Sequence, residues 1–82
     1  KLSEERRKEI IKIASEFAEN SKVTIRNIRR DFIESSKNEK KNSSLSEDDL
    51  KRRINEIQKI TDENIDKIDK ILESKKIDIL KV

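Results

Sequence analysis

The sequence predicts an all-α fold: a long antiparallel helical hairpin that forms two helices of a three-helix bundle. The 82 residues include no Gly and no Pro, so nothing interrupts a helix. Charged residues make up 48% of the chain, so much of each helix must face water. Apolar residues recur every three or four positions in two long segments, which predicts helices at about residues 3–41 and 46–81 and a turn at about 42–45.

The first helix is predicted to begin at Ser3. This serine can cap the helix, and Glu4 and Glu5 follow it at the end where a helix favours acids. The apolar stripe, with Ser21 in one apolar place, consists of Ile10, Ala14, Phe17, Ala18, Ile25, Ile28 and Phe32. The helix should end near Lys41, whose charge suits a C-terminus, and at ~1.5 Å per residue it should be on the order of 55 Å long.

The polar turn and the start of the second helix carry the clearest local signals. Asn42 is able to take a left-handed conformation in this turn, since the chain has no Gly for that role. Ser46 is the predicted N-cap, with Asp49 at the capping-box position and Leu45 and Leu50 spaced as a hydrophobic staple. The re-entry of the chain at this cap predicts antiparallel helices.

The apolar stripe of the second helix is as wide as that of the first. Its main positions are Leu50, Ile54, Ile57, Ile65, Ile68 and Leu72, and Ile60, Ile71 and Ile79 widen it. Thr61 takes one apolar place and is expected to bond a backbone carbonyl one turn back. Each stripe spans roughly 140° to 160°, whereas a two-helix seam needs only a narrow line. A further helix must cover the rest, from sequence upstream of Lys1 or from a second copy of the chain.

Composition argues against catalysis. The chain has no His and no Cys, which removes the imidazole base, the thiolate and the usual zinc ligands. Carboxylates are plentiful, but two exposed helices offer no pocket to tune a general acid. We therefore expect no enzyme, no catalytic residue, no metal, no cofactor and no small-molecule substrate. No apolar run approaches the ~20 residues of a membrane span, so no membrane partner is expected.

Three arginines, Arg26, Arg29 and Arg30, alternate with apolar residues in the first helix and fall on a sector beside its apolar face. The same sector, roughly 100° wide, holds further charged residues, namely Lys8, Lys12, Lys22, Lys37 and Lys40 with Glu4 and Glu19. The arginine fork matches phosphate oxygens, and cations along one helical edge are typical of phosphate-binding surfaces. The net charge is only +3, so binding would depend on this placement. The alternative interpretation is a solvated helix face.

Several segments resemble the ribosome recycling factor family: Leu2–Lys8, Val23–Asp31, Ser46–Asp49 and Ile57–Asp62. The resemblance covers essentially all 82 residues and corresponds to about the C-terminal half of the family's chain. It implies an L-shaped protein with a three-helix bundle and a small β domain inserted between the first and second helices of the bundle. This chain would be the second and third helices of that bundle domain, and the first helix and the β domain would precede Lys1.

The resemblance also implies a function. The family binds the post-termination ribosome through large-subunit rRNA near the peptidyl-transferase centre. With elongation factor G and GTP, it separates the subunits and releases mRNA. In the alignment that the resemblance implies, Arg29 matches the arginine on which the family's ribosome binding chiefly depends, and Arg26 and Arg30 lie beside it. Further candidates for rRNA binding are Lys22, in the same sector, and Arg7, near the hinge. The implied location is the bacterial cytoplasm, or a bacterial-type organelle such as a mitochondrion or plastid.

Two other functions fit the same residues. The hairpin could be a structural antiparallel coiled coil that binds another protein through its apolar stripe. It could also be an RNA-binding hairpin appended to an enzyme, such as the arm of a synthetase. Only the last of these predicts a catalytic domain upstream of Lys1.

Overall fold

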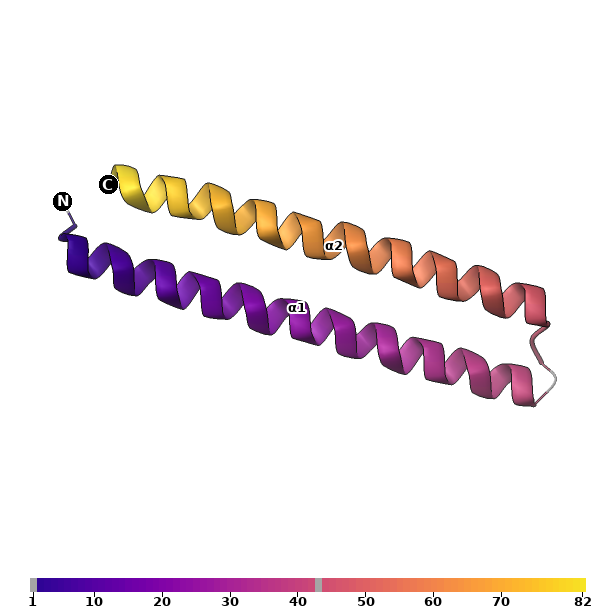
Figure 1. Ribbon diagram of the computed structural model, residues 1–82. Helices are drawn as coiled ribbons and strands as arrows, with labels where there is room; N and C mark the ends of the chain where they lie inside the picture. The colour runs from indigo at the N-terminus through magenta and orange to yellow at the C-terminus, as the bar shows by residue number, and fades with distance from the viewer. Residues whose placement is uncertain (1, 43) are drawn as a thin grey trace.

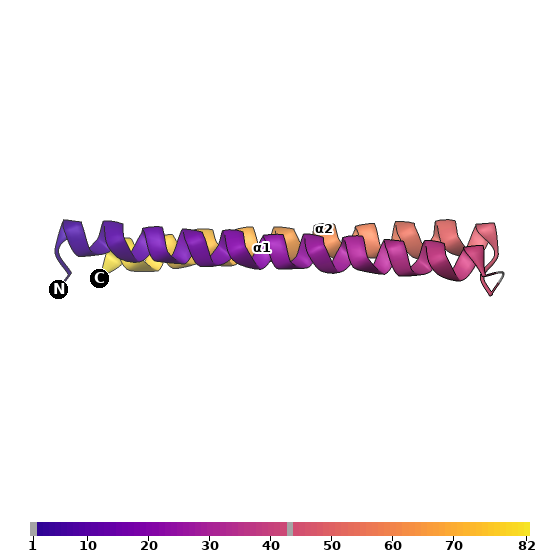
Figure 2. The same ribbon diagram turned by 90° about the horizontal axis from the view of Figure 1, so that it is seen from below.

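The computed structural model describes residues 2–42 and 44–82, which form two long antiparallel helices, α1 (Glu4–Lys41) and α2 (Glu47–Lys81) (Figure 1). The helices lie side by side in a single layer, so the hairpin measures 61 × 15 × 9 Å (Figure 2). The two ends of the chain meet at the end opposite the turn. The predicted all-α helical hairpin is therefore confirmed, while Lys1 and Ser43, included in the expected domain and turn, lie outside the described residues.

Both helices are capped by the serines that the sequence indicates, and each helix begins at the next residue. The Ser3 hydroxyl accepts a hydrogen bond from the Arg6 N–H at 3.2 Å, and the Ser46 hydroxyl accepts one from the Asp49 N–H at 3.1 Å. The capping box at Ser46 is only half formed, because the Asp49 carboxylate pairs with Arg52 at 3.1 Å. Aspartate is one methylene shorter than the glutamate that this motif prefers, so it reaches back to the cap less readily.

The turn is closed differently from the expectation. Asn42 has φ −84° and ψ 9°, so it does not take the left-handed conformation considered for it. The Ser44 N–H and the Ser44 hydroxyl both donate to the Glu39 carbonyl, at 3.1 and 2.9 Å. The backbone bond follows the 6→1 pattern that commonly ends a helix. The Asn42 N–H donates to the Asn38 carbonyl at 3.1 Å, so Asn42 and Ser44 together satisfy the carbonyls of Asn38 and Glu39.

The interior of the hairpin is open. Within the described residues no hydrophobic side chain is buried, and the only buried residues are Ser36 and Thr61. The Thr61 hydroxyl donates to the Ile57 carbonyl at 2.6 Å, as its place in the sequence predicts. One neighbour covers only part of each wide apolar stripe, so large side chains such as Phe17, which is 75% exposed, remain in contact with water. Neither helix carries the uncharged apolar length that crossing a bilayer requires.

Candidate nucleic-acid interface

An apolar groove runs between the helices on one side of the hairpin. Its larger hollow, of about 470 Å³, lies toward the termini and is lined chiefly by Ile10, Ile13, Ala14, Phe17, Ile68 and Ile71. A smaller hollow of about 220 Å³ continues toward the turn and is lined by Ile25, Ile28, Arg29, Ile57, Ile60, Thr61 and Asn64. We call these two hollows together the apolar groove. Most of its residues are apolar side chains that α1 and α2 leave partly exposed.

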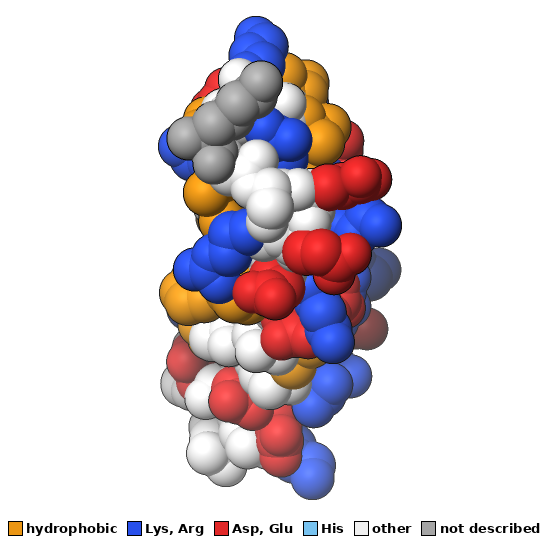
Figure 3. Space-filling view, turned by 90° about the vertical axis from the view of Figure 1, so that its left-hand side faces the viewer, with side chains coloured by type: hydrophobic (Ala, Val, Ile, Leu, Met, Phe, Trp, Pro, Cys, Tyr) orange, Lys and Arg blue, Asp and Glu red, His pale blue; other side chains and the backbone are white. Residues whose placement is uncertain are grey.

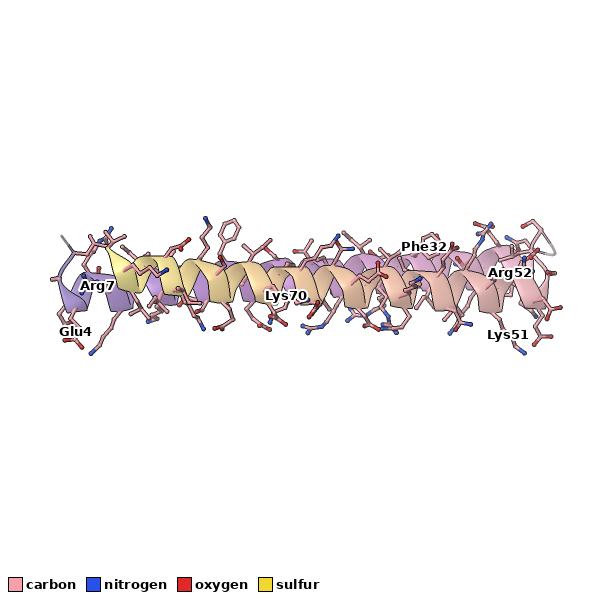
Figure 4. The ribbon with its side chains drawn as sticks, turned by 90° about the horizontal axis from the view of Figure 1, so that it is seen from above. Glu4, Arg7, Phe32, Lys51, Arg52 and Lys70 are labelled. Carbon is pink, nitrogen blue, oxygen red and sulfur yellow. The ribbon has the colours of Figure 1, made fainter. Side chains whose placement is uncertain are left out.

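The arginine cluster, Arg26, Arg29 and Arg30, extends from the edge of the apolar groove, which Arg29 lines, around the side of α1. Phe17 and Arg26 are separated by about two and a half turns, so they project from nearly opposite sides of the helix. In the end view of Figure 3, lysines and arginines alternate with acids along the right-hand side and also show at the top and on the left, while hydrophobic side chains show mainly on the left and at the top. In Figure 4, Phe32 lies on one long edge of the hairpin, and Glu4 and Lys51 lie on the other. Arg26 and Arg30 therefore project away from the larger hollow, while Arg29 borders the smaller one.

The arginine cluster has few acidic partners within the hairpin. Among the described residues, Arg29 and Arg30 form no ion pair, and the nearest carboxylate oxygen to Arg26, that of Glu19, is 3.9 Å away. Other arginines of the described chain have close partners, namely Arg6 with Glu9 at 3.0 Å, Arg52 with Asp49 at 3.1 Å and Arg53 with Glu39 at 2.9 Å. Most guanidinium donors of the cluster therefore stay available to an outside anion.

Arg29 differs from its two neighbours in its surroundings. It is half-buried beside α2, whereas Arg26 and Arg30 are exposed. Its Nε donates to Oε1 of Gln58 at 2.7 Å, and Nε2 of the same glutamine donates to Oδ1 of Asp62 at 2.9 Å. The sequence pattern missed Gln58, because periodicity places a residue on its own helix but does not identify its partner on the facing helix.

Lys22, another predicted binding residue, is tied to acids of its own chain. Its Nζ lies 2.8 Å from Asp69 on α2 and 3.4 Å from Glu19, and only 16% of its side chain is exposed. The hydrogen bond with Asp69 is the main reason why the pKa of Lys22 is raised above its ordinary value. Lys22 therefore links α1 to α2, and much of its charge is already compensated.

The Lys22 contact predicts a specific pH dependence of stability. Because its pKa is raised in the folded chain, the contribution is complete at neutral pH and disappears as the pH rises beyond the ordinary lysine range. Circular-dichroism melts of the wild type and of a Lys22→Gln variant measure it. We expect the wild type to melt at the higher temperature near pH 7, and the difference to vanish at strongly alkaline pH. A difference that grows with pH would contradict the assignment.

Arg7 lies far from the cluster. Its Nη2 donates to the Val82 carbonyl where the chain ends meet, and its buried Nε has no hydrogen-bond partner among the described residues (Figure 4). At ~1.5 Å per residue, Arg7 and Arg29 are separated by roughly 33 Å along α1. The structure therefore brings together Lys22 and the arginine cluster but leaves Arg7 at the far end.

The flank of α2 beside the cluster is acidic, with aspartates at positions 62, 66 and 69. Each has a partner in the hairpin: Gln58 for Asp62, Lys70 for Asp66 and Lys22 for Asp69. A polyanion would consequently be attracted to α1 and repelled by this part of α2. Within residues 2–42 and 44–82, no three potential metal ligands gather at one place. The arrangement is suited to holding a phosphate backbone along α1.

Comparison with known proteins gives a consistent result. The family model described as "Ribosome recycling factor" matches residues 1–80. The chain is 49% identical over 81 residues to a protein of Staphylococcus carnosus named "Ribosome-recycling factor", covering 99% of this chain and 44% of that protein. The protein of the same name from Halothermothrix orenii is 52% identical over 81 residues, which cover 99% of this chain and 44% of that protein. The one from Gloeothece citriformis is 53% identical over 78 residues, which cover 95% of this chain and 43% of that protein. The chain spans less than half the length of these curated relatives.

Proposed function

Because this chain belongs to the ribosome recycling factor family, we propose that it is part of a non-enzymatic factor that binds the post-termination ribosome. The arginine cluster holds rRNA phosphates of the large subunit near the peptidyl-transferase centre. The factor acts with elongation factor G and GTP hydrolysis to separate the subunits and release mRNA. It works in the bacterial cytoplasm, or in an organelle with bacterial-type ribosomes.

The observation that carries the proposed rRNA contact is the shortage of acidic partners around the arginine cluster. Three arginines outside the cluster lie close to carboxylates, as Arg53 does to Glu39 at 2.9 Å. Arg29 and Arg30 have no such carboxylate among the described residues, although 18 acids are spread through the chain. Planar guanidinium groups bind phosphate oxygens through paired N–H donors. Lys22 and Arg7 have partners within the hairpin, so we assign them a smaller share of the binding.

The apolar groove supports the proposed place of this chain in a larger domain. Residues 1–82 form the second and third helices of a three-helix bundle, and the first helix fills the apolar groove. A protein-interaction module would use the same groove for a separate partner. Membership of the family favours a helix of the same protein, because this chain spans only 44% of the curated relatives that it matches. A filled groove also stiffens the 61 Å hairpin into a rod.

The salt dependence of ribosome binding tests the rRNA contact. Each phosphate contact releases counterions, so the logarithm of the affinity for isolated large subunits should fall linearly with the logarithm of salt concentration. In a full-length recycling factor that carries this chain, Arg30→Ala should reduce that slope by about one unit. Filter binding over a series of salt concentrations measures the slope.

Arg52→Ala is the matched control, because Arg52 is exposed and lies near the turn on α2, with its side chain paired to Asp49 (Figure 4). This variant should keep the wild-type slope. A wild-type affinity that hardly responds to salt, or equal slopes for the wild type and Arg30→Ala, would overturn the proposed phosphate contact.

A further inference from the structure

Arg29 is the only member of the arginine cluster that is held by the facing helix within the described chain. Its Nε donates to Gln58 Oε1 at 2.7 Å, across the interface between α1 and α2. Gln58 in turn donates through Nε2 to Asp62 Oδ1 at 2.9 Å, one turn further along α2. Two consecutive hydrogen bonds thus connect Asp62 and Gln58 on α2 to the guanidinium of Arg29 on α1.

The donor and acceptor groups of Asp62, Gln58 and Arg29 determine the order of these hydrogen bonds. An ionised carboxylate can only accept hydrogen bonds, so Asp62 must face the amide nitrogen of Gln58. The amide oxygen of Gln58 is then turned toward α1, where it can accept from Arg29 Nε. Asp62 therefore determines which end of the amide Arg29 meets. No direct ion pair forms between Asp62 and Arg29, so the positive charge of the arginine is not cancelled.

The contact leaves the phosphate-binding part of Arg29 free. A guanidinium has five N–H donors, of which the bond to Gln58 uses the one on Nε. The four donors on the two Nη atoms form no hydrogen bond or ion pair with the described residues. Arg29 is half-buried and lines the smaller hollow of the groove, which further restricts the side chain. A side chain ordered before binding loses less conformational entropy when it binds.

We propose that Gln58, oriented by Asp62, is a positioning residue that aims the Nη edge of Arg29 at an rRNA phosphate. This inference rests on the function proposed above and adds two residues of α2 to a surface otherwise made by α1. Arg26 and Arg30 are exposed and have no comparable support from α2. Arg29 is therefore the arginine of the cluster that is held in place before binding, whereas the exposed side chains of Arg26 and Arg30 adjust their conformations to the RNA.

A double-mutant cycle in a full-length recycling factor that carries this chain tests the proposal. The wild type, Gln58→Met, Arg29→Ala and the double variant are compared for binding to isolated large subunits. Gln58→Met keeps a side chain of similar length but removes the acceptor, and should weaken binding about fivefold. In the Arg29→Ala background the same substitution should change the affinity less than twofold, because the group that Gln58 positions is gone.

The second readout is the Nε–H signal of Arg29 in NMR spectra of the same proteins. In the wild type this proton should exchange slowly with water, and it should exchange faster in Gln58→Met and in Asp62→Asn. Asn55→Leu removes another amide from α2 at an exposed position and should change neither the exchange rate nor the affinity. Thermal melts of all variants separate a loss of positioning from a loss of folding.

The outcomes distinguish the two proposals. If Arg29→Ala leaves binding unchanged, the proposed rRNA contact itself fails. If Arg29→Ala weakens binding but Gln58→Met does not, or weakens it equally in both backgrounds, Arg29 binds without help and Gln58 has no positioning role.

Discussion

Replacing Arg29 with alanine in a full-length recycling factor that carries this chain is expected to weaken binding to large ribosomal subunits about 30-fold, the loss of ~2 kcal/mol typical of an arginine hot spot. Arg29 is hydrogen-bonded to Gln58 and has no carboxylate partner among the described residues, so its remaining charge-assisted donors are available to a phosphate. Filter binding or fluorescence anisotropy at one fixed salt concentration measures the effect.

Arg53→Ala provides the matched control for Arg29→Ala. Arg53 also joins the two helices, through its 2.9 Å contact with Glu39, but it lies outside the arginine cluster. Loss of an interhelical arginine contact is thus common to both variants, and only Arg29→Ala should reduce binding strongly. Arg29→Lys should recover only part of the affinity, because lysine keeps the charge but lacks the planar fork. Equal affinities for both alanine variants would contradict a special role for Arg29.

Phe17→Ser should lower the free energy of unfolding of the full-length factor by about 3 kcal/mol, the lower end of the cost of truncating a buried aromatic side chain. In the hairpin, 75% of Phe17 is exposed in the apolar groove, so its loss would cost little if nothing covered it. The large expected effect arises only if another helix packs on the groove. Urea denaturation followed by circular dichroism gives the free energy directly.

Two companions of Phe17→Ser isolate the packing effect. Phe17→Leu keeps most of the apolar volume and should cost less than about 1.5 kcal/mol. Lys12→Ser, at an exposed position of α1, accounts for the lower helix propensity of serine. If Phe17→Ser costs no more than Lys12→Ser, the groove is open in the complete protein and the proposed bundle is wrong.

Local sequence signals predicted the outline of the hairpin well. Ser3 and Ser46 cap the two helices because each hydroxyl can satisfy an N–H three residues later, and both bonds form. Thr61 bonds the carbonyl of Ile57, a contact within a single turn of helix. The wide apolar stripes also indicated an uncovered surface, which the exposed Phe17 and Ile71 now display. All these features depend on interactions within one helix or on its periodicity.

Predictions that required finer geometry were less successful. Asn42 does not take the left-handed conformation, since donors from Ser44 close the end of α1 instead. Asp49 occupies the right position for a capping box, yet its carboxylate pairs with Arg52. In both cases, the end of α1 and the carboxylate of Asp49, more than one hydrogen-bond partner lies within reach. Spacing alone cannot choose among them, because a single hydrogen bond contributes a net free energy of only about 0.5–1.5 kcal/mol.

The amino-acid order alone determined that this chain forms two capped amphipathic helices with a cationic sector, because helical periodicity places every residue at a known angle on its own helix. It did not determine that Lys22 meets Asp69 or that Gln58 supports Arg29. These contacts depend on the register and rotation of α2 against α1, which are set by packing along the whole interface. The candidate binding residues could therefore be predicted from the periodicity of a single helix. Their partners on α2 could be identified only from the packing of the two helices.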